Sequence, residues 1–260
     1  MKRIYFFDID QTLYHNKKKI ILPQTKKLIL DLASKPGIIL GIATGRNYRN
    51  LNVLGDLISC FHYFVIMNGA VTISKNDGII DENPIPSENI QCFVNKIKNF
   101  NILLAGVNID KEVILYNPNL LDKSLVRYYQ KELNYVLDYD LKLMSKIYFM
   151  VALGSDFKKI KNFKNDLSFL NICFWNSHVD LTVDYVNKSY GIAKIKSKYP
   201  DYQLICTGDG SNDVEMLSYA DIGIAMGNSL YPRTKEVAKF IAPHIDSDQL
   251  YDFFKTNILI

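Results

Sequence analysis

Three stretches of the chain pass from an apolar run directly into acidic or hydroxyl residues. The runs at 2–7, 37–43 and 202–206 have the length and composition of buried strands. They lead into Asp8-Ile9-Asp10-Gln11-Thr12, into Thr44-Gly45-Arg46, and into Thr207-Gly208-Asp209-Gly210-Ser211-Asn212-Asp213. In an open α/β sheet, ligands bind outside the carboxyl ends of the strands. The three stretches therefore predict one pocket of carboxylates and hydroxyls, which is typical of phosphoryl transfer.

Asp8 and Asp10 stand two residues apart at the end of the first run. Carboxylates this close cannot both ionise freely without a compensating cation, so we expect a divalent metal ion or split pKa values. Asp is also a covalent nucleophile in reactions that pass through an aspartyl-phosphate. Taken alone, the pair is equally compatible with a helix N-cap or a surface turn, where Asp is common.

Asp209 and Asp213 shift that balance toward chemistry. The glycines beside Asp209 permit a tight turn and a close approach of the backbone, and the two carboxylates add hard oxygen ligands. Because Mg²⁺ usually takes one or two protein carboxylates together with phosphate oxygens and water, Asp8 and Asp209 predict a magnesium site. A capping turn would need only one Asp here.

Two further features are suited to holding a phosphate. Thr44 and Gly45 combine a hydroxyl donor with a small residue where a helix is expected to begin. Lys188 precedes another expected helix and would place a positive point charge on the phosphate. Each feature is common by itself, so its weight comes from the strand ends described above.

The first and last thirds of the chain alternate strand-like and helix-like segments, as βαβ units around a parallel sheet do. The first third predicts strands at 2–7, 38–43 and 63–67, a polar excursion at 14–21, and helices at 23–34 and from Asn47 onward. The last third predicts helices at 190–198, 212–219 and 232–238, and strands at 202–206, 222–225 and 239–241.

The middle of the chain has a different pattern, with strands at 114–117, 147–153 and 179–183 and amphipathic stretches at 87–99 and 156–167. The predicted fold class is therefore α/β, with a Rossmann-like parallel sheet core and an inserted α+β cap domain. The core is expected at 1–80 and 185–260, and the cap at 81–184. An insertion that leaves the core beside a phosphate pocket is expected to act as a lid.

Composition argues against several other classes of protein. The net charge of +4 over 260 residues, with lysines spread along the chain, lacks the dense basic stripe of a nucleic-acid binder. The four cysteines form no Cys-x-x-Cys pair, so neither a disulfide framework nor a zinc site is expected. The chain shows no signal-peptide pattern and no apolar run of the roughly 18–20 residues that span a bilayer. We expect a cytoplasmic protein with no membrane contact and no obligate protein partner.

In their order along the chain, these motifs resemble those of the haloacid dehalogenase superfamily of phosphatases. The segment 8–12 resembles the first motif, Thr44-Gly45-Arg46 the second, Lys188 the third and the segment 208–213 the fourth. The large insertion between the second and third motifs is similar to that of the Cof-type branch of sugar-phosphate phosphatases. Two flanking segments strengthen this likeness, Asn68-Gly69-Ala70 and Ala225-Met226-Gly227-Asn228-Ser229. The resemblance covers nearly the whole chain.

The resemblance implies a role for each motif residue. Asp8 would attack the phosphorus, while Asp10 would protonate the leaving oxygen and then activate the hydrolytic water. Mg²⁺ would be held by the Asp8 carboxylate, the Asp10 backbone carbonyl and the Asp209 carboxylate, with Asp213 acting through the metal's water shell. The phosphate would be held by the Ile9 backbone N–H and by Thr44, Gly45, Lys188 and Asn212.

The chain departs from the family pattern at two places. Gln11 stands where the family usually has Gly, and a Gln at positive φ would cost roughly 1 kcal/mol or more. Lys188 is followed by Ser189-Tyr190-Gly191, whereas Gly more often comes directly after the lysine.

The expected function is that of a Mg²⁺-dependent phosphomonoester hydrolase for small phosphorylated metabolites, in particular sugar phosphates. A phosphomutase or phosphotransferase would share the aspartyl-phosphate, and would differ in passing the phosphoryl group to a second hydroxyl. A non-catalytic sensor of a phospho-ligand would have no need of the general acid Asp10. The histidines lie outside the motifs and are expected in core or surface roles: His15, His62, His178 and His244.

Overall fold

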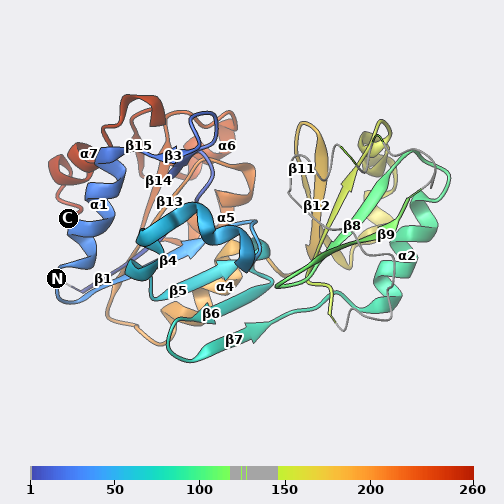
Figure 1. Cartoon of the computed structure of the whole chain (residues 1–260), viewed down its shortest axis with the longest axis horizontal. Helices are drawn as coiled ribbons and strands as arrows, with labels where there is room; N and C mark the ends of the chain where they lie inside the picture. The colour runs from blue at the N-terminus through green and yellow to red at the C-terminus, as the bar shows by residue number, and fades with distance from the viewer. Residues whose placement is uncertain (1, 118–123, 125–126, 128–145) are drawn as a thin grey trace. The chain divides into compact units, whose positions relative to one another are not determined.

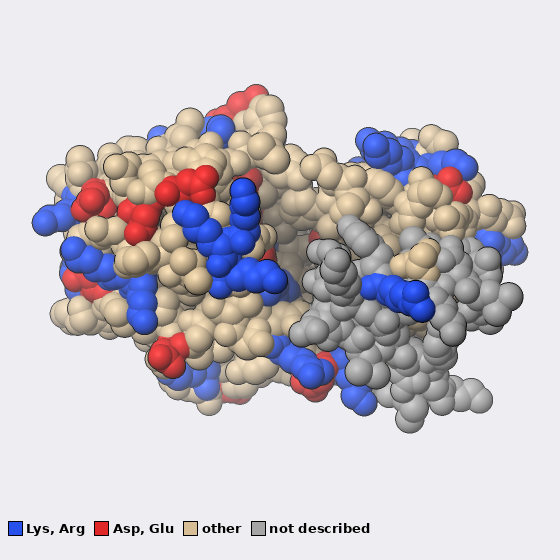
Figure 2. Space-filling model, turned by 45° about the horizontal axis from the view of Figure 1, so that its top comes forward, with Lys and Arg blue, Asp and Glu red and all other residues tan. Residues whose placement is uncertain are grey.

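The structure is a computed structural model that describes residues 2–117, 124, 127 and 146–260. The chain divides into two compact units, one formed by Met1–Asp81 with Asn187–Ile260 and the other by Glu82–Val186. Among the described residues, no helix is long and apolar enough to cross a membrane. On the face drawn in Figure 2, Lys and Arg side chains lie in several separate groups with Asp and Glu between them.

The first unit is built on an eight-stranded sheet in the order β15-β14-β13-β1-β4-β5-β6-β7, in which β6 is Val71–Ser74 and β7 is Gly78–Glu82 (Figure 1). Its central strands pair in parallel and are buried almost throughout, as expected for strands covered on both faces. Their bounds are β1 Arg3–Phe7, β4 Ile38–Ala43, β5 Tyr63–Ile66, β13 Gln203–Gly208, β14 Ile222–Met226 and β15 Phe240–Ala242. This is the predicted α/β fold with a parallel central sheet.

Helices cover both faces of this sheet. The crossover from β1 through α1 (Pro23–Ala33) to β4 runs along the sheet in one direction, and that from β13 through α5 (Val214–Tyr219) to β14 runs in the other. Because both crossovers are expected to be right-handed, the two helices lie on opposite faces. In line with this, α1 contacts α7 (Leu250–Thr256), whereas α5 contacts α4 (Lys188–Lys196) and α6 (Pro232–Val237).

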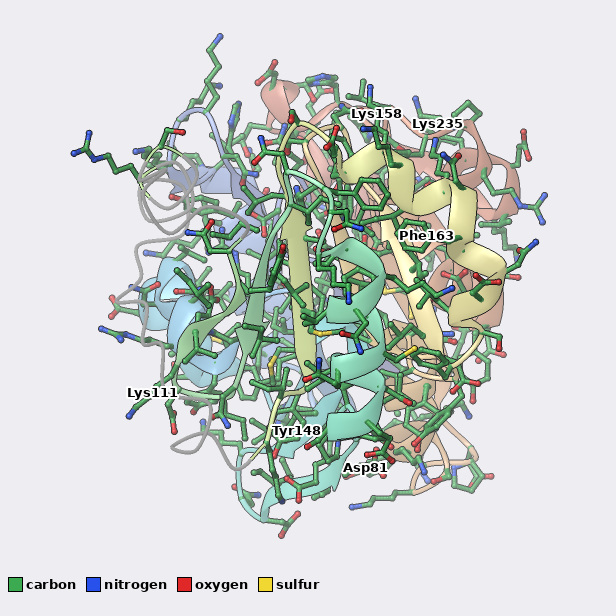
Figure 3. The ribbon with its side chains drawn as sticks, turned by 90° about the vertical axis from the view of Figure 1, so that its right-hand side faces the viewer. Asp81, Lys111, Tyr148, Lys158, Phe163 and Lys235 are labelled. Carbon is green, nitrogen blue, oxygen red and sulfur yellow. The ribbon has the colours of Figure 1, made fainter. Side chains whose placement is uncertain are left out.

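The second unit contains a five-stranded sheet in the order β11-β12-β10-β8-β9. Its strands pair antiparallel, with bounds β8 Leu103–Val107, β9 Glu112–Tyr116, β10 Phe149–Leu153, β11 Leu170–Phe174 and β12 His178–Val183. Figure 3 shows α2 (Ser87–Ile97) and η4 (Phe157–Leu167) side by side over one face of this sheet. The ring of Phe163, in η4, stacks on that of Phe100, with ring centroids 5.9 Å apart.

Several elements differ from those that the sequence pattern predicts. The polar segment after β1 forms a hairpin of β2 (Tyr14–His15) and β3 (Ile20–Ile21). The helix expected from Asn47 is the 3₁₀ helix η1 (Tyr48–Cys60), interrupted at Gly55, where φ is 51°. The sheet also continues beyond β5 into β6 (Val71–Ser74), which pairs antiparallel, and β7 (Gly78–Glu82). These short elements depend on tertiary partners, which periodicity does not show.

The helix expected at 190–198 begins two residues earlier, at Lys188. The side chain of Asn187 accepts a hydrogen bond from the Tyr190 N–H at 3.0 Å and so caps this helix end. Lys188 therefore stands in the first turn of α4, on a rigid element.

Candidate active site

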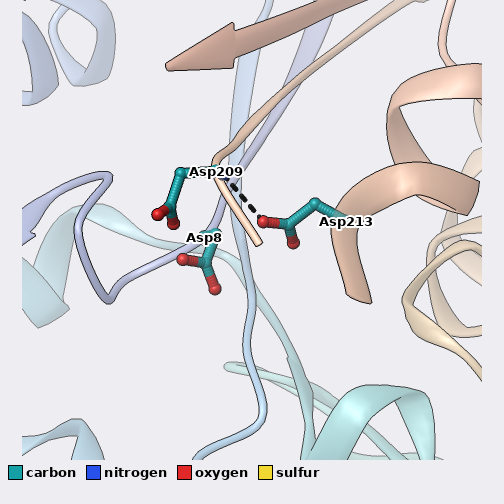
Figure 4. Close-up of side chains that lie close together, drawn as sticks. All are labelled: Asp8, Asp209 and Asp213. Carbon is teal, nitrogen blue, oxygen red and sulfur yellow. Dashed lines mark hydrogen bonds between the residues drawn. The ribbon is translucent and has the colours of Figure 1, made fainter. Parts of the chain in front are cut away.

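Three carboxylates gather at the carboxyl ends of the central strands. Phe7 of β1 pairs with Thr207 of β13, so the residues that follow each strand leave the sheet at the same edge. One carboxylate oxygen each from Asp8, Asp209 and Asp213 lies within 4.8 Å of the others. Figure 4 shows the side chains of Asp8 and Asp209 next to each other and a hydrogen bond that joins Asp209 to Asp213.

Lys188 neutralises part of this charge. Its side chain is fully buried, and its Nζ donates to Asp8 Oδ1 at 2.7 Å and to Asp213 Oδ1 at 2.6 Å. The start of α4 can approach because Gly69 has no side chain, since a Cβ there would lie 2.0 Å from the Asn187 carbonyl oxygen. The structure thus brings the predicted lysine onto the predicted nucleophile.

Asp213 shapes the loop that follows β13. Its Oδ2 accepts the backbone N–H groups of Asp209 at 2.9 Å and Gly210 at 2.7 Å. A Cβ at Gly208 would lie 2.5 Å from the Asp213 carboxyl group, so only glycine fits there. With one oxygen on Lys188 and the other on two amides, Asp213 fixes both the lysine and the loop. Its predicted action through a metal's water shell remains a prediction.

The Asp209 carboxylate has weaker partners. Thr12 Oγ1 lies 3.4 Å from Oδ1 and Asn228 Nδ2 lies 3.5 Å from Oδ2, both at the long limit of a hydrogen bond. The Asp209 backbone carbonyl accepts the Ser229 hydroxyl at 2.6 Å, which fixes the residue's main chain. Asp209 is thus held by its backbone while its carboxylate is available to a cation.

Burial and crowding make these carboxylates hard to ionise. Burial raises the pKa of Asp8 to about 7; the charge of Lys188 opposes the rise, and Asp213 and Asp10 add to it. The pKa of Asp209 rises to about 9, first through burial and then through the charges of Asp8 and Asp213. Burial lowers the pKa of Lys188, but Asp213 and Asp8 outweigh it and hold that pKa above its usual range.

A divalent cation fits this site. Three acidic side chains lie together with a single buried lysine that pairs with two of them, and the donors are all oxygen atoms, which suits a hard cation such as Mg²⁺. Asp8 and Asp209 offer the available carboxylates, since both oxygens of Asp213 are engaged. Asp10 is not in the carboxylate cluster, so its predicted contribution through the backbone carbonyl remains a prediction.

Three of the residues predicted to hold phosphate lie around Asn68: Thr44, Gly45 and Asn212. Asn212 Nδ2 donates to Asn68 Oδ1 at 2.8 Å, and a Cβ on Gly45 would lie 3.3 Å from the same oxygen. Thr44 is buried, and its Oγ1 accepts the Arg46 N–H at 3.2 Å.

Ile9 occupies the turn after β1. Its side chain is fully buried, and its carbonyl accepts the N–H groups of Leu13 at 3.0 Å and Tyr14 at 2.7 Å. The role of its own N–H toward phosphate remains a prediction.

Asp10 has a different environment from Asp8. Arg46 Nε donates to Asp10 Oδ2 at 2.8 Å, and Arg46 Nη2 donates to Oδ1 at 2.7 Å. The Asp10 side chain is 37% exposed, whereas that of Asp8 is 8% exposed. The two carboxylates are therefore held by different cations, as two different chemical roles would require.

Sequence reasoning missed the contributions of Arg46, Asn68 and Asn228. In the sequence Arg46 stands out only as part of the motif Thr44-Gly45-Arg46, and nothing beyond that place signals its pairing with Asp10. Asn68 has φ 54° between Met67 and Gly69, which also have positive φ. Because Asn and Gly tolerate this conformation, Asn-Gly directly after a strand could have indicated a strained turn at a functional site.

The histidines contact backbone groups and acidic side chains outside the carboxylate cluster. His15 is buried, and its Nε2 lies 2.5 Å from Asp246 Oδ1, while its Nδ1 accepts the Lys18 N–H at 3.4 Å. His62 Nδ1 accepts the Leu40 N–H at 3.2 Å. The other two pair with nearby acidic residues, His178 with Asp180 and His244 with Asp246.

Gln11 adopts a left-handed conformation, with φ 58°, and its Oε1 accepts the Asn16 N–H at 3.1 Å. Replacement by Gly or by Ala removes that hydrogen bond equally, but only Gly relieves the strain. We therefore expect Gln11→Gly to be more stable than Gln11→Ala by about 1 kcal/mol, the reverse of the usual order. Urea unfolding of both variants measures this difference, and an Ala variant of equal or greater stability would contradict it.

The comparisons with known proteins agree with this geometry. A family model of haloacid dehalogenase-like hydrolases matches residues 5–254. The chain belongs to this family. The match confirms the resemblance drawn from the motifs, and with it the assignment as an enzyme of the phosphatase type.

Relatives match along almost the whole chain. The "Putative phosphatase YkrA" of Bacillus subtilis (strain 168) is 26% identical over 254 residues, covering 95% of this chain and 94% of the relative. The 5-amino-6-(5-phospho-D-ribitylamino)uracil phosphatase YitU of the same strain is 25% identical over 263 residues, covering 95% and 94%. The solved structure of the subclass IIB sugar phosphatase BT4131 covers all of both chains at 24% identity and a TM-score of 0.84, which supports the fold.

Proposed function

We propose that this protein is a Mg²⁺-dependent phosphatase that hydrolyses small phosphorylated metabolites, in particular sugar phosphates. One observation carries the proposal: Asp8 pairs with Lys188 and lies near Asp209, while Asp10 pairs with a different cation, Arg46. A nucleophile needs nearby positive charge to approach a phosphate, whereas a general acid must be within reach of the leaving oxygen. Asp8 has Lys188 beside it, and the Asp10 side chain is 37% exposed, so the two environments suit these two roles.

The proposed reaction has two steps. In the first, an oxygen of the Asp8 carboxylate bonds to phosphorus, the bond from phosphorus to the leaving oxygen breaks, and Asp10 gives its proton to that oxygen. In the second, Asp10 takes a proton from water as the water oxygen bonds to phosphorus and the bond to Asp8 breaks. The products are an alcohol and inorganic phosphate, and Asp10 ends protonated, ready for another turnover.

The residues around Asp8 would stabilise the charge that develops on the phosphoryl oxygens. We propose that Thr44, Gly45, Asn212 and the Ile9 N–H hold these oxygens, with Lys188 supplying a fixed positive charge. Mg²⁺ would be held by Asp8 and Asp209, with the Asp10 carbonyl completing the protein's share, and would supply further positive charge toward the phosphate.

The substrate class is proposed from the relatives and from the inserted unit. Of the similar proteins, BT4131 is named as a sugar phosphatase, and YitU is named as a phosphatase of 5-amino-6-(5-phospho-D-ribitylamino)uracil. We propose that the unit Glu82–Val186 acts as a cap that selects the organic part of the substrate. We also propose that the protein works in the cytoplasm, without a membrane or nucleic-acid partner.

The test is phosphate release from a panel of phosphorylated sugars, nucleotides and pyridoxal phosphate, with Mg²⁺ or with EDTA. We expect turnover that needs Mg²⁺ and that Asp8→Asn abolishes, because Asn cannot form the acyl phosphate. Labelling with ³²P-phosphorylated substrate should place acid-stable, hydroxylamine-labile label on the wild type alone. Release of a phosphorylated isomer in place of inorganic phosphate would show a mutase. Binding without turnover by wild-type protein that holds Mg²⁺ would show a sensor.

A further inference from the structure

Arg46 holds the Asp10 carboxylate by both oxygens. The two hydrogen bonds, of 2.8 Å from Nε and 2.7 Å from Nη2, form a side-on bidentate pair. Such a pair fixes the plane of the carboxylate as well as its position. Each carboxylate oxygen keeps a second lone-pair direction, so a leaving oxygen or a water molecule can still reach Asp10.

Arg46 is itself held from several directions. Its Nη1 donates to the Asn50 carbonyl in η1 at 3.2 Å, and its guanidinium carbon lies 5.7 Å from the ring centroid of Tyr14 in β2. Its main chain is fixed by the bond from its N–H to Thr44 Oγ1 and by the bond from the Met67 N–H to its carbonyl. The guanidinium therefore has little freedom to turn toward another ligand.

The partners of the three guanidinium nitrogens indicate what Arg46 does. Nε and Nη2 are engaged by Asp10, and Nη1 is engaged by Asn50. An arginine that grips a phosphate side-on directs Nε and Nη2 at two phosphate oxygens. In this site Asp10 occupies that edge of the guanidinium, so a side-on grip on the phosphate would require breaking the pair with Asp10.

We infer that Arg46 is a positioning residue for Asp10, and that it sets proton transfer to the leaving group without binding the transferred phosphate. This inference rests on the proposed function. Asp10 is more than a third exposed, so without Arg46 its short side chain would turn toward water. A misplaced carboxyl group cannot deliver a proton within the hydrogen-bond distance that general acid catalysis needs.

A positioning role for Arg46 makes the effect of its loss depend on the leaving group, which a purely structural role would not. A sugar alkoxide is a poor leaving group and needs a proton as the bond to phosphorus breaks, whereas p-nitrophenolate leaves without one. The ratio kcat/KM reports the steps through leaving-group departure. Loss of Arg46 should therefore lower kcat/KM strongly for a sugar phosphate and weakly for p-nitrophenyl phosphate.

The experiment compares Arg46→Gln with wild type on p-nitrophenyl phosphate and on whichever hexose or pentose phosphate the wild type hydrolyses fastest. We expect kcat/KM for the sugar phosphate to fall by about 10²-fold or more, and that for the aryl phosphate by less than about 10-fold. The KM for the sugar phosphate should change little. Arg49→Gln is the matched control, since Arg49 is an exposed arginine three residues away, in the 3₁₀ helix η1 that follows Arg46, and it should leave both ratios unchanged.

A second comparison tests whether Arg46 acts through Asp10. Asp10→Asn should show the same dependence on leaving group, and Arg46→Gln added to Asp10→Asn should cause almost no further loss on the sugar phosphate. Equal losses on both substrates, a raised KM at unchanged kcat, or additive losses in the double variant would each overturn the inference. Thermal unfolding of each variant with Mg²⁺ excludes misfolding as the cause. If wild-type protein hydrolysed neither substrate, the proposed function itself would fail.

Discussion

Replacement of Lys188 by Met is expected to destabilise the protein by about 3–5 kcal/mol and to abolish turnover. The Lys188 side chain is fully buried and is shared by Asp8 and Asp213. Met is apolar and of similar length, so it fills the space but leaves two buried carboxylates without their cation. Urea unfolding in EDTA measures the loss of stability, and phosphate release with Mg²⁺ measures the loss of activity.

Two further variants make this prediction specific. Lys194→Met changes an exposed lysine on the same helix, which pairs with Asp81 at 3.5 Å, and should cost about 1 kcal/mol or less. Adding Asp213→Asn to Lys188→Met removes one of the stranded charges and should recover part of the stability without restoring turnover. A Lys188→Met protein as stable as wild type would show that the buried pairs contribute nothing.

The metal-free protein is expected to lose stability as pH rises from about 4 to about 9. Asp8 and Asp209 have raised pKa values of about 7 and about 9 when folded, against 3.8 as their ordinary value. Between these values the folded state binds more protons than the unfolded state, so the free energy of unfolding falls with rising pH. The stabilisation is complete below the ordinary pKa and is lost as pH passes through the two folded values.

Bound Mg²⁺ should remove this dependence, because it holds both carboxylates in their ionised form. Thermal unfolding across this pH range should show a fall of roughly 5–10 °C in EDTA and a nearly constant midpoint with saturating Mg²⁺. Calorimetry in buffers of different ionisation enthalpy should detect proton release when Mg²⁺ binds near neutral pH. Asp209→Asn should weaken both effects, and a midpoint that rises with pH in EDTA would contradict the prediction.

The carboxylates whose pKa values are lowered act in a different pH window. Hydrogen bonds lower the pKa of Glu82, Asp156 and Asp246, so their contributions are present above the ordinary pKa and are lost as pH falls. They therefore contribute to acid unfolding and do not oppose the decline expected toward alkaline pH.

Much of the site could be predicted because its residues follow strands directly. The apolar runs before Asp8, Thr44 and Asp209 indicate buried parallel strands, and parallel strands place their carboxyl ends at one edge. The order of the strands in the sheet then brings together residues that are far apart in the chain. Thr12 and Asp209, for example, are in contact although 197 positions separate them. Lys188 is different, because only its place among the family motifs singled it out from the many lysines.

The sequence alone thus determined the α/β core, the family and the acidic residues at the strand ends, because strand periodicity and motif order are local properties of the chain. The tertiary structure decided which charges pair: Lys188 with Asp8 and Asp213, and Arg46 with Asp10. It also decided the left-handed turn at Met67-Asn68-Gly69 and the raised pKa values of Asp8 and Asp209. These properties arise from burial and from distances between segments that are remote in the chain. The spacing of residues along the chain predicts neither the burial nor the distances.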